Sequence, residues 1–180
     1  PSEMIEKVHL IGNGQNINLN KIEAKELGDK AVFHGFLQKR ELHEFMAESH
    51  FLLLPSKAEG FPKVVAEAAC YGTIPIVSDV GSLAHYINEL NGFLWEINNK
   101  KFNYESVMLN ALYSNQTELQ IKSEEVLNGE STPKFMFLIC HSFQLVARHL
   151  EIGKVTKRRS TSFGVFPVPM KWISIFLKIS

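Results

Sequence analysis

The chain has 180 residues, 45% of them hydrophobic and 21% charged, which is the balance of a soluble globular protein of about one domain. Its two isolated cysteines, Cys70 and Cys140, and the lack of a bilayer-length apolar run or signal peptide argue against a disulfide scaffold, a zinc knuckle and a membrane-spanning protein, and predict a cytoplasmic location. Residues 131–180 carry eight basic side chains and one acidic, whereas residues 1–130 carry 19 − 8 = 11 basic and 19 − 1 = 18 acidic, which predicts two segments with different roles.

Strands and helices alternate along the first 130 residues. Short apolar runs read as strands, and segments with apolar residues at helical spacing lie between them. Gly28 and Gly72 are suited to ending two of the helices. In chain order, the predicted elements are a strand at 8–11, a helix at 20–27, a strand at 31–35, a helix at 41–48, a strand at 50–54, a helix at 63–71, a strand at 74–78, a helix at 82–87, a strand at 92–95 and one or two helices in 103–127.

This alternation predicts an α/β fold with a doubly wound, Rossmann-like parallel sheet in residues 1–130. Right-handed crossovers place all the strand ends at one edge, where ligands bind, so the loops at Gly12, Gly35, Pro55 and Ser78 are expected to share a cleft. Residues 131–180 are less regular. They are expected to form a divergent basic and aromatic segment, with a helix at 134–150 followed by a tail that is either disordered or in contact with an anionic membrane surface.

The segment from Ser56 to Glu67 carries the chemistry. A strand ends before it, a loop holds Glu59 and Gly60, and a helix begins near Pro62. The free N–H groups and the dipole of a helix start favour a phosphate or diphosphate, and carboxylates accept hydrogen bonds from sugar hydroxyls. Glu59 is equally an ordinary stabilising acid at a helix N-terminus, so both interpretations of this residue stay open.

Five ordered blocks resemble one enzyme family. Ser56, Glu59-Gly60-Phe61-Pro62 and Glu67 resemble the Glu-x7-Glu signature of retaining GT-B glycosyltransferases, especially family 4 (glycosyltransferases group 1). The other blocks are residues 8–14 with their Gly-x-Gly turn, 32–36, 67–77, and 78–82 together with 91–94. The resemblance spans residues 7–96 and implies the C-terminal, donor-binding half of a GT-B fold.

The resemblance also implies roles for individual residues. Glu59, the catalytic candidate, would contact the hydroxyls of the transferred sugar, and Glu67 would bind the ribose. The sugar and phosphates would be held by backbone groups around Gly60, with the nucleoside near the ends of the first two strands. The expected substrate-binding residues are Gly60, Phe61, Pro62, Lys63, Val64, Glu67, His34, Gly35, Gly12, Gly14 and Ser56. No cofactor and no metal are expected, and the donor is a UDP-sugar or another nucleoside-diphosphate sugar.

The chain also departs from the family pattern. The diphosphate-binding Arg and Lys of the family belong to a first strand-helix unit that residues 1–130 lack, and an acceptor-binding N-terminal domain is expected as a missing partner. The chain is therefore expected to be an inactive fragment of a transferase of polysaccharide biosynthesis. Two alternatives remain: a GT-B sugar-nucleotide epimerase, and a non-catalytic nucleotide-binding fragment.

Simpler interpretations exist for some candidates. Gly12 and Gly14 alone are often just a turn, and Ile17 stands where a dinucleotide fingerprint needs its third glycine. His34 is either a ligand or a satisfied polar residue of a strand. The histidines show no metal-ligand spacing, and nucleic-acid binding finds no support in the distribution of basic and aromatic residues.

Overall fold

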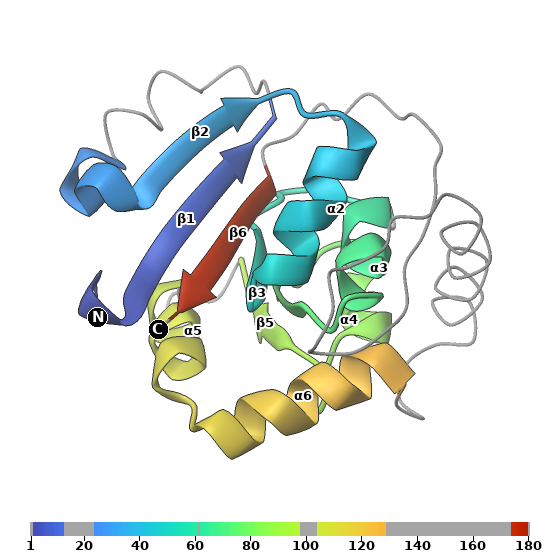
Figure 1. The fold of residues 1–180 in the computed structure, drawn as a ribbon. Coiled ribbons are helices and arrows are strands. Elements are labelled where there is room, and N and C mark those ends of the chain that lie inside the picture. Colours follow the sequence, from blue (N-terminus) through green and yellow to red (C-terminus); the bar gives the residue numbers. More distant parts are fainter. Residues whose placement is uncertain (1, 13–23, 61, 98–103, 129–173, 180) are drawn as a thin grey trace.

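A six-stranded sheet forms the centre of the computed structural model, which describes residues 2–12, 24–60, 62–97, 104–128 and 174–179 (Figure 1). The order of the strands is β2-β1-β6-β3-β4-β5. Apolar side chains dominate β1, β3, β4 and β5, as expected for strands covered on both faces. The strands are β1 (Ile5–Ile11), β2 (Ala31–Gly35), β3 (Phe51–Leu54), β4 (Ile74–Ser78), β5 (Phe93–Trp95) and β6 (Ser174–Ile179).

Five strands follow the predicted parallel arrangement, and the sixth does not. β1 pairs with β2, β3 with β4, and β4 with β5, all in parallel. β6 lies between β1 and β3 and is antiparallel to both. A Rossmann sheet has the order 3-2-1-4-5-6, so β6 stands where the first strand of such a sheet would be.

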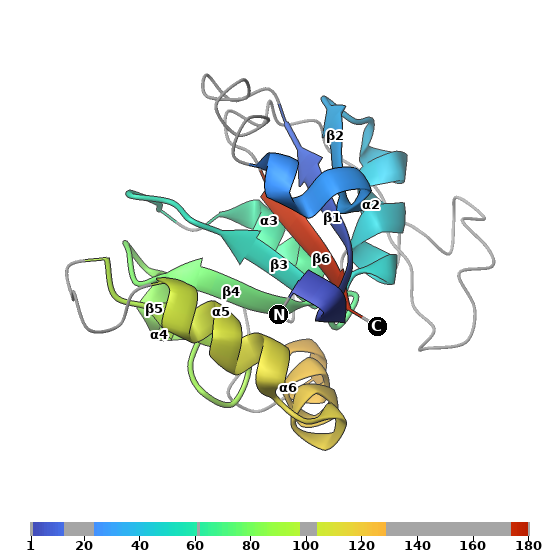
Figure 2. The same cartoon turned by 90° about the vertical axis from the view of Figure 1, so that its left-hand side faces the viewer.

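Helices cover both faces of the sheet. On one face, α2 (Lys39–Glu48), α3 (Lys63–Ala69) and α4 (Leu83–Tyr86) enclose a core that includes Leu52 and Val77. On the other face, α5 (Tyr104–Tyr113) packs over Phe51, Ile76 and Trp95. Figure 2 shows α5 beside β4 and β5, with α2 on the opposite side of the molecule. The α6 helix (Gln116–Asn128) packs against α3 through Val126. The predicted doubly wound α/β fold is confirmed.

Two segments differ from the prediction. Residues 24–30 form a 3-10 helix, η2, with a kink at Gly28 (φ 55°, ψ −134°), instead of an α-helix ending there. The left-handed φ of Gly28 permits a bend that other residues resist. The second difference is β6, because residues 163–180 gave no strand pattern. The other short 3-10 helix is η1 (Ser2–Met4). The predicted helix at 134–150 lies outside the described residues.

Within the described residues, none of the helices combines the length and apolar character needed to cross a bilayer. Cys70 is buried and disulfide-bonded, so the prediction of two isolated thiols is wrong. The cytoplasmic location stays a prediction.

Candidate functional site

The ends of β1 and β2 are joined directly. The Gly12 N–H donates a 2.7 Å hydrogen bond to the Gly35 carbonyl. Both glycines have positive φ values, 121° and 65°, in a range that side chains with a Cβ rarely adopt. The two turns expected to frame the nucleoside therefore lie side by side, while Gly14 lies outside the described residues.

His34 belongs to a cluster of three rings. A 2.9 Å hydrogen bond joins His34 Nε2 and His9 Nδ1, with one ring donating and the other accepting. Phe45 from α2 packs against both rings, with centroids 4.4 Å from His34 and 4.6 Å from His9. Burial lowers the pKa of His34, and the charge of Glu41 opposes this shift. His34 is thus a satisfied polar residue here, and its role as a ligand stays a prediction.

Ser56 and Glu59 form the centre of the loop that follows β3. The Ser56 hydroxyl donates a 2.6 Å hydrogen bond to Glu59 Oε1, and the Ser78 hydroxyl at the end of β4 donates to the Ser56 carbonyl. Ser56 and Ser78 are buried, whereas Glu59 is half-buried. A buried hydroxyl thus fixes a partly accessible carboxylate at the end of the sheet where parallel α/β folds bind ligands.

The loop after β4 supports the loop after β3. The Gly60 carbonyl accepts hydrogen bonds from the Ser82 hydroxyl (2.7 Å) and the Ser82 N–H (3.3 Å). A Cβ added to Gly81 would lie 1.8 Å from the Glu59 carbonyl oxygen, a distance that no real structure tolerates. Gly81 therefore lets the two loops approach, and together with Ser82 it holds the backbone of Glu59 and Gly60.

The α3 helix begins directly after this loop. Pro62 is its N-cap residue, and Lys63 and Val64 are its first two helical residues. The first N–H groups of a helix lack intrahelical partners and point outward along the axis, although Val65 N–H already donates to the Pro62 carbonyl. The predicted backbone anion site corresponds to this first turn, and Phe61 lies outside the described residues.

Glu67 lies about one turn further along α3 and is only 8% exposed. Its Oε1 lies 3.6 Å from Lys39 Nζ on α2. Burial raises the pKa of the Glu67 carboxyl, while the positive charges of Lys39 and Lys63 oppose that shift. The carboxylate is therefore held at the junction of α2 and α3 by one ion pair, beside a second lysine.

A buried polar pair also spans α2 and the end of α3. The His43 Nδ1 and the Tyr71 hydroxyl share a 2.8 Å hydrogen bond. Burial lowers the pKa of His43 to about 4, with Lys39 adding to the shift. Burial also raises the pKa of Tyr71, as does the charge of Glu67. Both groups are accordingly neutral near pH 7, and Lys39 and Glu67 supply the charges of this junction.

The structure sorts the predicted residues into three neighbourhoods. Gly12, His34 and Gly35 meet at the ends of β1 and β2, Ser56, Glu59 and Gly60 are bound to the loop after β4, and Glu67 is bound to α2. Sequence reasoning missed Lys39, Gly81 and Ser82 as parts of the site. The block at residues 78–82 was a signal for the last two, whereas nothing in the sequence links Lys39 to Glu67.

No group of three or more His, Cys, Asp or Glu residues suited to holding a metal ion occurs in the part of the chain that the structure describes. The three neighbourhoods together offer carboxylates, hydroxyls, lysines and backbone amides. Such a set can bind a polyhydroxylated anion through hydrogen bonds and charge.

A Rossmann-like sheet with this loop chemistry is the fold of one half of a GT-B glycosyltransferase. The chain aligns with WaaG, a glycosyltransferase involved in lipopolysaccharide biosynthesis, with a TM-score of 0.58 and 18% identity over 82% of this chain and 38% of that one. It aligns with Anabaena Alr3699/HepE in complex with UDP and glucose with a TM-score of 0.53 and 16% identity, over 79% and 40%. The sequence profile of the family Glycosyl transferases group 1 matches residues 7–119. The chain belongs to that family.

The chain is also similar to one curated protein. An uncharacterized 41.2 kDa protein in the cps region of Klebsiella pneumoniae is 33% identical over 87 residues, which is 48% of this chain and 23% of that protein. The chain thus spans about a quarter of this relative and about 40% of the two solved structures. The predicted resemblance to GT-B glycosyltransferases is confirmed.

Proposed function

We propose that this chain is the donor-binding part of a retaining glycosyltransferase, which moves a sugar from a nucleoside diphosphate to a saccharide or lipid-linked acceptor. The observation that carries the proposal is that Ser56 holds Glu59 before the first turn of α3, while Lys39 holds Glu67 within the same helix. Two carboxylates on one short loop-helix unit suit the two sugar rings of a nucleotide sugar, with its diphosphate between them.

Each part of the donor has a partner in this arrangement. Glu59 accepts hydrogen bonds from hydroxyls of the transferred sugar, and Glu67 accepts them from the ribose. The phosphates lie at the backbone between Gly60 and Val64, where N–H groups and the helix dipole favour negative charge. The turns at Gly12 and Gly35 frame the base, together with His34 and the sequence-predicted residue Gly14. During transfer the bond between the anomeric carbon and the phosphate oxygen breaks, and charge builds up on the departing diphosphate.

The comparisons support a class of donor and acceptor. HepE is described in complex with UDP and glucose, WaaG acts in lipopolysaccharide biosynthesis, and the Klebsiella relative lies in a cps region. We therefore propose a UDP-sugar as donor and a saccharide of a surface polysaccharide as acceptor. Because the chain spans about 40% of the two solved structures, we propose that it binds the donor and that a further, acceptor-binding part is needed to transfer the sugar.

Isothermal titration calorimetry of the chain with UDP, ADP, GDP and UDP-glucose tests the proposal. We expect binding of at least one nucleotide, and about tenfold weaker binding in Glu67→Gln because the ribose loses a charged acceptor. Glu44→Gln is the matched control, since Glu44 lies on the exposed side of α2 in an ion pair with Arg40.

A wild-type chain that is folded yet binds none of these ligands contradicts the proposal. Thermal unfolding first checks that the wild type and Glu67→Gln are both folded. If the two then bind the nucleotide with equal affinity, Glu67 does not bind the ribose, and its ion pair is only a structural feature. In the full-length enzyme, Glu59→Ala is expected to lower kcat at least a hundredfold if this carboxylate acts on the transferred sugar.

A further inference from the structure

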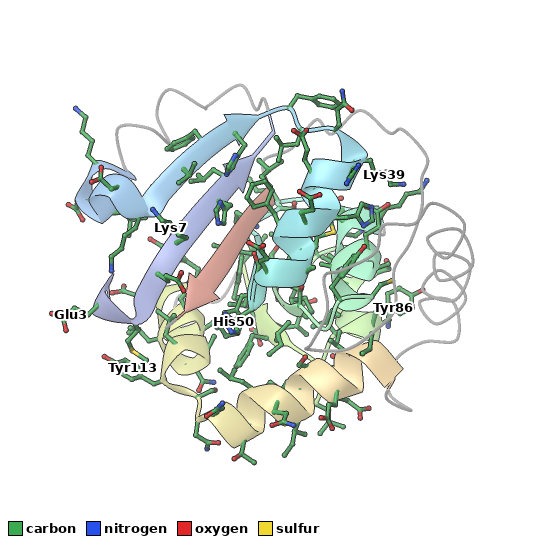
Figure 3. All side chains as sticks on the ribbon, in the orientation of Figure 1. Glu3, Lys7, Lys39, His50, Tyr86 and Tyr113 are labelled. Atoms are coloured by element: carbon green, nitrogen blue, oxygen red, sulfur yellow. The ribbon has the colours of Figure 1, made fainter. Side chains whose placement is uncertain are left out.

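Lys39 is the first residue of α2, and its half-buried side chain lies beside Glu67. Its Nζ is 3.6 Å from Glu67 Oε1, and the two side chains are only 17% and 11% exposed. Figure 3 labels Lys39 at the beginning of α2, in the part of the molecule where β1 and β2 end. A lysine so placed loses much of its hydration, and that cost needs a compensating interaction.

The neighbouring residue on the same helix shows the ordinary surface alternative. Arg40 Nε lies 3.5 Å from Glu44 Oε1, and those side chains are 75% and 51% exposed. Such a pair is screened by water and contributes little. The Lys39–Glu67 pair is desolvated, and at 3.6 Å it is longer than the 2.7–2.9 Å of a strong charge-assisted hydrogen bond. The geometry of this pair is therefore that of a loose ion pair, in which the ammonium group keeps N–H donors for a second partner.

The charges of the proposed donor site give a reason for a lysine at this position. A diphosphate that lies between Glu59 and Glu67 meets two carboxylates of its own sign, and their repulsion is large wherever water is excluded. Among the described side chains, Lys39 and Lys63 are the cations whose charges act on Glu67. Lys63 is exposed at the start of α3, whereas Lys39 is already in contact with the carboxylate.

We infer that Lys39 is a donor-site residue whose ammonium group is shared between Glu67 and the phosphate nearest the nucleoside. This inference rests on the proposed function. Ribose bound to Glu67 brings its 5′-phosphate close to the same carboxylate, and the three N–H donors of Lys39 can serve both groups at once. In the absence of donor, the lysine neutralises Glu67; with donor bound, it offsets the phosphate charge.

The test compares a nucleoside diphosphate with its nucleoside. Calorimetry measures the affinity of the full chain for UDP, ADP and GDP and, in separate titrations, for uridine, adenosine and guanosine. The proteins compared are the wild type, Lys39→Ala, Lys39→Met and Lys39→Arg. Arg40→Ala is the control that removes a positive charge from the adjacent, exposed position. We expect Lys39→Ala and Lys39→Met to weaken diphosphate binding at least tenfold with nucleoside binding changed less than threefold. We also expect Lys39→Arg to restore most of the affinity, and Arg40→Ala to match the wild type.

The salt dependence adds an independent readout. Because one phosphate contact is lost, the affinity of Lys39→Met for the diphosphate should fall less steeply with salt concentration than that of the wild type. A wild type that binds diphosphates while Lys39→Met binds them equally well overturns the inference and leaves the proposed function intact. Equal weakening of diphosphate and nucleoside also overturns it, because Lys39 would then act only by positioning Glu67. A folded wild type that binds no nucleotide overturns both.

Discussion

Glu59 and Glu67 lie close together in the sequence, but the structure holds them by different means. Glu59 is half-buried and accepts a hydrogen bond from the neutral Ser56 hydroxyl, whereas Glu67 is buried against the charged Lys39. A hydroxyl leaves a carboxylate with its charge uncompensated, while an ammonium group neutralises it. Glu59 is therefore held by a neutral hydroxyl, whereas Glu67 is held by a cation.

His43 makes the stability of the protein dependent on pH. Burial lowers the pKa of His43 to about 4, from 6.5 in the unfolded chain. Between these two pH values His43 is protonated in the unfolded state and neutral in the folded state. The contribution of His43 to the free energy of unfolding is therefore complete above pH 6.5 and is lost as the pH falls toward 4. The loss amounts to about 3 kcal/mol for the whole shift, at 1.36 kcal/mol per pKa unit.

Denaturant unfolding at pH 7.0 and pH 4.5 measures this effect, and His43→Gln should remove most of it. His85→Gln is the control, since His85 is exposed on α4. Glu67 acts in the opposite direction because its pKa is raised above 4.5, mainly by burial, so its stabilising effect is lost as the pH rises. Comparing the wild type with His43→Gln at the same pH cancels the contribution of Glu67, because both proteins contain it. Parallel pH profiles for the wild type and His43→Gln would refute the assignment.

At the scale of the elements, the loops after β3 and β4 form one unit. Ser78 donates to the Ser56 carbonyl, and Ser82 donates to the Gly60 carbonyl. The β4 loop thus holds the backbone on both sides of Glu59 without contacting its carboxylate in the described interactions. The shape of the proposed sugar-binding loop is set by a neighbouring loop about twenty residues away.

Gly81→Ala is expected to force these loops apart. The added methyl would lie 1.8 Å from the Glu59 carbonyl oxygen, at a φ of 57° that alanine rarely adopts. Overpacking and backbone strain together predict a loss on the order of 3 kcal/mol in the free energy of unfolding. Gly60→Ala is the contrasting variant, because its methyl would meet nothing within 4 Å at a φ outside the left-handed range. If chemical denaturation finds Gly81→Ala and Gly60→Ala equally stable, Gly81 does not lie this close to the Glu59 carbonyl.

The sequence predicts those elements whose pattern is local. β3 reads as a strand because Phe51 to Leu54 is an uninterrupted apolar run before a proline, and α2 reads as a helix because Leu42, Phe45 and Met46 share one face. Ser56, Glu59 and Gly60 were found because their motif is contiguous. The Lys39–Glu67 pair was not, since it joins two helices through tertiary packing, and a lysine at a helix start carries no signal of its partner.

At the scale of the whole molecule, β6 joins two parts of the sheet. β1 and β2 form one parallel pair, and β3, β4 and β5 form a parallel set of three. Among the described strands, β6 alone pairs with both β1 and β3. The family match ends at residue 119, so this central strand comes from outside the matched region, and short-range patterns gave no sign of it. The predicted boundary at residue 130 stays a prediction.

Removing residues 174–180 should separate the two parts of the sheet. The loss of both ladders exposes the inner edges of β1 and β3, so we expect cooperative unfolding in denaturant to disappear or its midpoint to fall sharply. A chain that lacks only Ser180 keeps all of β6 and serves as the control. Phe176→Pro is a second variant, because a proline in a central strand removes a ladder hydrogen bond. An unchanged unfolding transition in both variants would show that β6 is dispensable.

The central place of β6 also dictates the order in which the molecule can assemble. Ile5 is opposite Ile179 in the β1–β6 ladder, so this pairing joins two strands that are very far apart in the sequence. Contacts of such high sequence separation carry a large closure entropy and form late. Until then, a nascent or refolding chain presents two unfinished sheets with open inner edges, which are surfaces on which other chains can add strands. We therefore expect refolding to be slow and to lose yield to aggregation as the protein concentration rises.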